Sequence, residues 1–262
     1  MPFQIAAGAV IAHALDGQVL FELDDPHGNA PLAGVLALEA TGGPTTVAFK
    51  NIRLRKIRAG LSTDGAGRSG WLDLFKPDQG LKGWFGSKGE YAQVWTVSAD
   101  GTVTGSGAKS HLYSEGQYTN FEFKADVNLS PRANSGMYFR ARPAPDYPHG
   151  YEAQLYNTGS GDDRKTGSLY KFSDVKRLLV SDNTWFNQHV IAVGNRIVIK
   201  VNGRVVVDYV DDQRTYTSGR LALQQISPTA SVRFRNVLVK PLPEDATAAW
   251  AEVRRETPEL RP

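Results

Sequence analysis

Two short stretches in the middle of the chain carry polar side chains at a spacing that suits a binding or catalytic surface. Residues 134–140 read Asn-Ser-Gly-Met-Tyr-Phe-Arg, and residues 150–157 read Gly-Tyr-Glu-Ala-Gln-Leu-Tyr-Asn. Both alternate as strands do, so that successive side chains point to opposite faces. The pattern predicts that Tyr138 and Arg140 share one face of a sheet with Glu152. Such a face suits a sugar, because polar groups bind its hydroxyls and aromatic rings contact its flat sides.

Neighbouring strands are expected to extend this polar face. Apolar residues at alternate positions in 219–225 and 232–239 point inward, so Gln224 and Arg235 should point to the polar side. The predicted substrate-binding residues are Asn134, Tyr138, Gln154, Tyr170, Lys171, Gln224 and Arg235.

The two histidines nearest these strands receive different interpretations. His149 lies in the loop that enters the strand with Glu152, and a histidine of near-neutral pKa suits a general base. An ordinary surface histidine fits the same pattern. His111 precedes a strand that has no polar companions in the sequence, and we interpret it as structural.

A Gly- and Asp-rich segment, 157–174, comes after the second stretch. Its Asp162 and Asp163 could bind a hard cation or act as a carboxylate pair, although both also fit plain turn positions. The segment ends near Tyr170 and Lys171, which could reach the same polar face.

The composition restricts the class of protein. The chain has 262 residues, 41% of them hydrophobic, which suits one large β domain or two small ones. Its formal net charge of +3 is small and no dense basic stripe occurs, so nucleic-acid binding is not indicated. The absence of cysteine excludes disulfides and thiolate catalysis. No apolar run approaches the roughly 18 residues of a membrane span.

The first 58 residues repeat part of the C-terminal half of the chain. The aligned blocks are 8–21 with 194–207, 34–39 with 219–224, and 47–54 with 232–239. In the first pair Asp16-Gly17 falls on Asn202-Gly203, and both dipeptides favour a tight hairpin turn. The predicted domains are 1–58 as a partial copy, 59–70 as a Gly-rich linker, 71–242 as the complete domain, and 243–262 as a polar tail with a short helix.

The partial copy, 1–58, alternates like half of a sandwich without its partner sheet, and such an apolar face needs a cover. We expect it to cover the complete domain of the same chain or to pair with its counterpart in a homo-oligomer. A truncated first domain explains the pattern equally well.

The complete domain reads as about a dozen short strands separated by Gly, Asn, Asp or Pro turns. The expected strands include 91–97 and 169–172, and no long helical pattern occurs before residue 244. The sequence therefore predicts an all-β protein, a two-sheet jelly-roll β-sandwich.

Eight motifs in order carry a family resemblance. They are Gly83-Trp84 after 72–75, 134–140, 150–154, 166–170, 185–187, 201–203, 223–224 and 234–237. Together they resemble the 3-keto-disaccharide hydrolase domain over about 70–242, whereas 1–58 matches only its last third. The resemblance implies a concanavalin A-like jelly roll. It also implies a periplasmic or secreted protein, although residues 1–8 lack the basic start of a signal peptide.

The family acts on glycosides already oxidised to a ketone at sugar carbon 3. The ketone acidifies the proton on carbon 2, a base removes it, the group on carbon 1 leaves, and water can add back. The resemblance implies Glu152 as base or metal ligand, His149 as a second candidate base, and Arg140 and Gln154 as contacts to sugar or oxyanion. One divalent metal ion is left open as a cofactor, with Glu152 and Asp163 as its candidate ligands.

Other functions remain open at this point. The chain lacks the Glu-x-Asp-x-x-Glu strand of laminarinase-type glycosidases, so two-carboxylate glycoside hydrolysis is not supported. A non-catalytic lectin-like module would use the same fold, since fold does not settle function. A structural role, with 1–58 joining chains, is the third possibility.

Overall fold

The computed structural model describes residues 70–86, 91–158, 163–257 and 260, and three strands before them. The chain divides into two compact units, Met1–Gly67 and Arg68–Pro262, and each is treated by itself. None of the helices described is long and apolar enough to cross a membrane.

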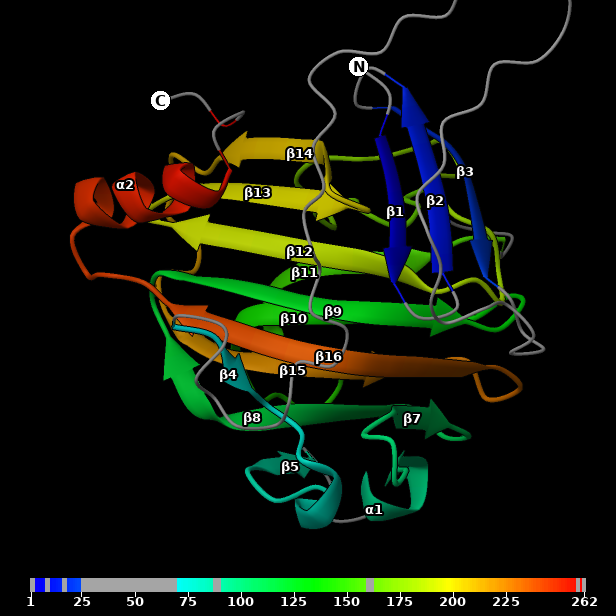
Figure 1. The fold of residues 1–262 in the computed structure, drawn as a ribbon. Helices are drawn as coiled ribbons and strands as arrows, with labels where there is room; N and C mark the ends of the chain where they lie inside the picture. The colour runs from blue at the N-terminus through cyan, green and yellow to red at the C-terminus, as the bar shows by residue number, and fades with distance from the viewer. Residues whose placement is uncertain are drawn as a thin grey trace, which may run out of the picture. The chain divides into compact units, whose positions relative to one another are not determined.

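The second unit is a sandwich of two antiparallel sheets (Figure 1). The five-stranded sheet has the order β11 (His149–Tyr156), β10 (Asn134–Arg142), β15 (Gly219–Gln225), β8 (Ser110–Tyr118) and β5 (Trp84–Gly86). The eight-stranded sheet runs β14 (Arg204–Val210), β13 (Arg196–Val201), β12 (Phe186–Val193), β9 (Phe121–Leu129), β16 (Ser231–Pro241), β7 (Val103–Ser106) and β6 (Trp95–Val97), with β4 (Leu72–Asp73) paired to β16. The predicted all-β jelly-roll sandwich is confirmed.

The apolar core lies between the two sheets and results from strand alternation. Met137 and Phe139 of β10 and Leu155 of β11 are fully buried against Phe123 and Val127 of β9. Every second residue of these strands points away from this core. The outward residues of the five-stranded sheet are therefore free to form a functional face.

A helix covers part of the outer face of the eight-stranded sheet. In α2 (Ala246–Glu256), Ala249 and Val253 pack on Ile191 of β12 and Val198 of β13. The helix begins at Asp245, whose carboxylate accepts a hydrogen bond from the Ala248 amide at 2.8 Å, as N-cap residues do.

Three local predictions need correction. The segment 91–97 begins as a helical turn, α1 (Tyr91–Val94), and only its end, β6, is a strand. The segment 169–172 forms isolated bridges and lies along β11. The sequence did not indicate β4, β5 or the 3-10 helix η1 (Pro77–Gln79), because these elements are too short to show a period.

The first unit contains β1 (Phe3–Ala7), β2 (Val10–Leu15) and β3 (Gln18–Asp24), of which only the strand pairing is described. In the β2–β3 hairpin, Val10 pairs with Asp24. The aligned positions in the β13–β14 hairpin, Arg196 and Val210, pair in the same way. Both hairpins also shift register at aligned positions, between His13 and Ala14 and between Ile199 and Lys200. This supports the proposed repeat, but the blocks 34–39 and 47–54 lie outside the described residues, so the partial copy remains a prediction.

Candidate functional site

The outer face of the five-stranded sheet carries polar and aromatic side chains in two transverse rows. Strand register sets these rows, since residues opposite each other on neighbouring strands share a face. The first row is Glu152, Tyr138, Ala222, Tyr113 and Phe85, and the second is Gln154, Gly136, Gln224 and His111. All five strands thus contribute to one face.

A chain of hydrogen bonds crosses the two rows. The Tyr138 hydroxyl donates to Glu152 Oε2 at 2.7 Å. Gln224 Nε2 lies 3.1 Å from the Tyr138 hydroxyl and 3.1 Å from His111 Nε2, and its two N–H groups can serve both. This arrangement makes His111 Nε2 an acceptor, which assigns the ring proton to Nδ1.

These four side chains are almost completely buried, with exposed fractions of 6% for Glu152, 4% for Tyr138, 1% for Gln224 and 2% for His111. Burial raises the pKa of Tyr138, and the Glu152 carboxylate raises it further, so Tyr138 stays a donor. Burial, assisted by the charge of Lys109, lowers the pKa of His111 to about 4, so the ring is neutral at pH 7.

One acceptor in this network has no partner among the residues that the structure describes. Gln224 Oε1 is buried without a hydrogen bond among the residues described. A buried polar atom without a partner is costly, and the cost disappears when a ligand supplies the missing donor. A sugar hydroxyl is a donor of the required kind.

Gly136 provides the space that the Glu152 carboxylate occupies. A Cβ atom on Gly136 would lie 2.2 Å from Glu152 Oε1 and 2.9 Å from Glu152 Cγ. The Glu152 carboxylate therefore extends from β11 over β10 and occupies the space where a side chain of residue 136 would lie. Only glycine permits this placement without moving Glu152.

We accordingly expect Gly136→Ala to displace the Glu152 carboxylate and to lower any activity that depends on it by about 10- to 100-fold. The Tyr138–Glu152 hydrogen bond should break while the sheet stays intact. A crystal structure of the variant and its kcat/KM would check this. Ala222→Gly, on the neighbouring strand, is the matched control, and equal losses in both variants would contradict the expectation.

The other end of the face is aromatic. Phe85 and Tyr113 stack with ring centroids 5.7 Å apart, and the Arg220 guanidinium lies 5.0 Å from the Phe85 ring. Arg220 also donates to the Ser114 carbonyl at 2.9 Å, which fixes it over Phe85. Tyr113 is fully buried and Phe85 partly buried, so this aromatic pair lies directly beside the polar cluster. Aromatic rings next to a few polar groups are the usual composition of a small-molecule site.

Tyr170 lies next to Glu152 at the edge of this face, and its role in substrate binding stays a prediction. Its backbone amide donates to the Glu152 carbonyl at 2.9 Å, and its hydroxyl contributes to the raised pKa of Tyr138. Lys171 is exposed at the edge, with Nζ 5.7 Å from the Tyr170 ring. Asn134 begins β10, opposite Tyr156, at the far end of the face from Tyr113.

Arg140 does not join this face, and the prediction that it lies beside Tyr138 and Glu152 is wrong. A β-bulge between Phe139 and Arg142, with φ of 49° at Arg140, interrupts the alternation. The guanidinium instead donates to the Thr119 carbonyl at 2.7 and 3.0 Å and to the Tyr216 carbonyl at 3.2 Å.

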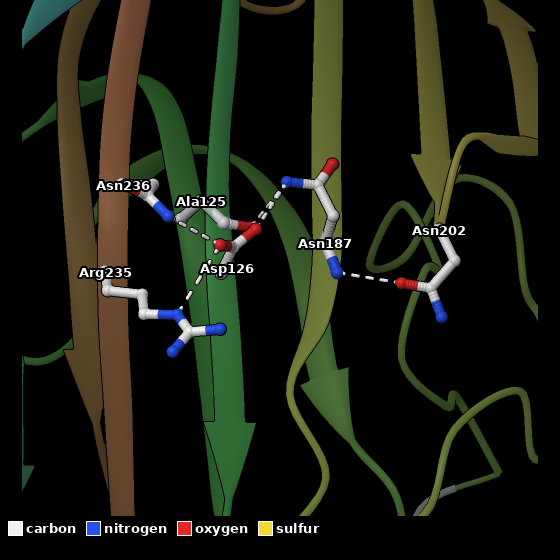
Figure 2. A network of polar contacts seen from close by, with 6 residues as sticks. All are labelled: Ala125, Asp126, Asn187, Asn202, Arg235 and Asn236. Atoms are coloured by element: carbon white, nitrogen blue, oxygen red, sulfur yellow. Dashed lines mark hydrogen bonds and ion pairs between the residues drawn. The ribbon is translucent and has the colours of Figure 1, made fainter. Parts of the chain in front are cut away.

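Arg235 belongs to the other sheet, so its predicted position beside Gln224 is also wrong. The chain crosses between sheets after β15, and β16 pairs with β9. Figure 2 shows Arg235 and Asn236 on one side of Asp126, with Asn187 on the other. Arg235 Nε lies 3.6 Å from Asp126 Oδ2, and its guanidinium lies 4.2 Å from the Trp185 ring.

The remaining two candidates are also separate from the network. His149 is exposed at the start of β11, and strand alternation places it on the opposite face from Glu152. Asp163 is exposed, and Asp162 lies outside the described residues. In the part of the chain that the structure describes, no group of three or more His, Asp or Glu side chains could hold a metal ion.

Sequence reasoning missed His111, Tyr113 and Phe85. His111 and Tyr113 flank Leu112, which is fully buried, so the alternation around Leu112 was the signal that placed both on the polar face. Phe85 lies in a three-residue strand with no such pattern.

Comparison with known proteins gives a consistent result. Two solved structures from Parabacteroides distasonis ATCC 8503, described as candidate glycosyl hydrolases, share this fold. The first is 22% identical with a TM-score of 0.57, over 67% of this chain and 95% of that one. The second is 19% identical with a TM-score of 0.56, over 66% and 99%. A search of curated proteins found no match.

The family evidence covers the whole sandwich. The model of the 3-keto-alpha-glucoside-1,2-lyase-like domain matches residues 70–240, which include both sheets and every residue of the two rows. The chain therefore belongs to the 3-keto-alpha-glucoside-1,2-lyase-like (3-keto-disaccharide hydrolase) domain family.

Proposed function

We propose that this protein cleaves glycosides whose sugar carries a ketone at carbon 3, with Glu152 as the base. The observation that carries the proposal is the Glu152 carboxylate, which Tyr138 holds at 2.7 Å over the space left by Gly136. A single positioned carboxylate beside neutral donors suits proton abstraction next to a carbonyl. It does not suit direct glycoside hydrolysis, which needs two carboxylates.

The chemistry proceeds by elimination. Glu152 takes the proton from carbon 2, and the electron pair of that C–H bond moves toward the ketone to form an enolate. The enolate then forms a double bond between carbons 1 and 2 and expels the group on carbon 1 with its bonding electrons, and that group gains a proton. Water adds to carbon 1 of the resulting enone, and the net reaction is hydrolysis.

Tyr138 and Gln224 assist the elimination by contacting the sugar close to Glu152. Once Glu152 holds the proton, the Tyr138 hydroxyl no longer faces a carboxylate and becomes available to the developing oxyanion on carbon 3. Gln224 Oε1, which has no hydrogen-bond partner in the described part of the chain, accepts a sugar hydroxyl and fixes the ring. Phe85 and Tyr113 present an apolar surface to the sugar or its leaving group.

The test is to incubate the protein with 3-keto-trehalose or a 3-keto-glucoside, and with the unoxidised parent sugar, and to monitor released sugar. We expect cleavage of the ketone substrates alone, because without the ketone the proton on carbon 2 is not acidic. Binding of the ketosugar without cleavage would overturn the proposal in favour of a lectin-like module. Activity lost to a chelator and restored by a divalent ion would add a metal to the site.

A further inference from the structure

The segment 143–148, Pro-Ala-Pro-Asp-Tyr-Pro, which we call the roof segment, connects β10 to β11. It leaves β10 after Arg142 and enters β11 at His149, and these two residues pair with each other. That pair lies at the end of the sheet where Ala141 pairs with Arg220 of β15.

The roof segment nevertheless contacts β8 at the opposite end. The Tyr147 ring lies 5.9 Å from the His111 ring, with the planes at 67°. Lys109 Nζ, just before β8, lies 4.4 Å from the Tyr147 ring and 3.8 Å from Asp146 Oδ1. Burial raises the pKa of Tyr113, and the nearby backbone amide of Ala144 partly offsets this by lowering it. Ala144 therefore lies close to the Tyr113 hydroxyl.

These contacts require the segment to cross the polar face. His111 pairs with Gln224, four positions along β15 from Arg220, and β8 is three strands away from β11. At the usual strand dimensions the separation is about 13 Å along the strands and about 14 Å across them. Contacts to Tyr113 and His111 over that span place the segment above the two rows.

The crossing explains why the polar face is buried. Gln224, Tyr138 and Glu152 point away from the core, yet 6% or less of each is exposed. Glu152 points to the side of the sheet that the roof segment crosses, and not into the core. Movement of the segment would therefore open a path for a sugar to this face.

The contacts of the roof segment are suited to such movement. Asp146 and Lys109 have side chains that are 86% and 37% exposed, and Tyr147 is 49% exposed, so water weakens their contacts. Three prolines stiffen the segment itself. Its attachment point is a single residue pair, Arg142 with His149, beyond the β-bulge of β10.

We infer that the roof segment is a hinged cover of the candidate site, and that Tyr147 is the residue that holds it shut and limits which sugars reach Glu152. The hinged cover deepens the proposed function and rests on it only for the identity of the ligand. Opening exposes His111, which is 2% exposed in the closed form.

The test measures how fast diethyl pyrocarbonate modifies His111, read by peptide mass spectrometry. His149 is already exposed in the closed form and serves as the internal reference. Tyr147→Ala should raise the His111 rate by at least about 10-fold, because a less stable closed form opens more often. Asp146→Asn, a milder change, should raise it less. Leu178→Ala removes a similarly exposed side chain elsewhere and should leave it unchanged.

A variant in which the roof segment is cross-linked to residue 109, just before β8, should show the opposite effect on His111 modification. The chain has no cysteine, so Lys109→Cys with Asp146→Cys can be joined by a short bis-maleimide without side reactions. Joining should slow His111 modification and cleavage of a 3-keto-glucoside by about 10-fold relative to the same variant capped with N-ethylmaleimide. Equal His111 rates in wild type and Tyr147→Ala, or equal rates in joined and capped protein, would overturn the inference. If no form cleaves the ketosugar, the proposed function fails while the His111 rates still decide the roof segment.

Discussion

Replacing Glu152 with glutamine is expected to lower kcat for cleavage of a 3-keto-glucoside by at least about 100-fold, the usual contribution of a positioned general base. Glutamine has the same shape and its amide oxygen can still accept from Tyr138, so the change removes basicity and little else. The measurement is steady-state release of the sugar at saturating substrate. Ligand affinity should change much less than kcat.

Two further measurements make this result interpretable. The melting temperature and circular dichroism of Glu152→Gln should match the wild type, which shows that the loss is chemical. Glu115→Gln, at an exposed carboxylate on β8, is the control for loss of a negative charge. Full activity in Glu152→Gln would remove this residue from the mechanism, and the neutral His111 would become the candidate base.

Arg140→Ala should instead act on stability, with a loss of about 3–5 kcal/mol in the free energy of unfolding, typical of breaking a buried charged group from its partners. The Arg140 side chain is 1% exposed, and its removal leaves the carbonyls of Thr119 and Tyr216 without donors. It also removes a positive charge near Asp211, which accepts from the Tyr151 hydroxyl. Thermal unfolding should show a fall in Tm of about 6–20 °C.

Arg142→Ala is the matched control for this prediction. Arg142 is exposed on the same strand just past the bulge, so its loss should change stability by less than about 0.5 kcal/mol. Arg140→Lys keeps the charge but not the forked geometry and should fall between the two. A melting temperature of Arg140→Ala equal to that of the wild type would show that the buried guanidinium contributes nothing to the fold.

The fold was predictable because most strands of the sandwich alternate without interruption. Leu221 and Leu223 face the core, and Gln224 therefore faces the site, as the period of two requires. The same rule correctly joined Glu152, Gln154 and Tyr138 on neighbouring strands. The period of two is a local property of each strand, so the sequence is sufficient to assign it.

The errors arise where the structure departs from local rules. One extra residue in β10 turns Arg140 away from the face, and no feature of the sequence marks that bulge. Arg235 was misplaced because the strand order of a sandwich is not the chain order. The alternation around Leu112 indicates the face of His111, but its partner Gln224 lies more than 100 residues away, so spacing alone does not show that the two side chains meet.

Gly136 has a consequence for how such a protein can change over evolution. Its missing side chain is the space that the carboxylate needs, whereas the aromatic surface of Phe85 and Tyr113 does not depend on it. A single added methyl group would thus displace the Glu152 carboxylate and leave the aromatic pair in place. Under the proposed function, one codon change within one architecture would then weaken catalysis and spare the aromatic contacts of a carbohydrate-holding module.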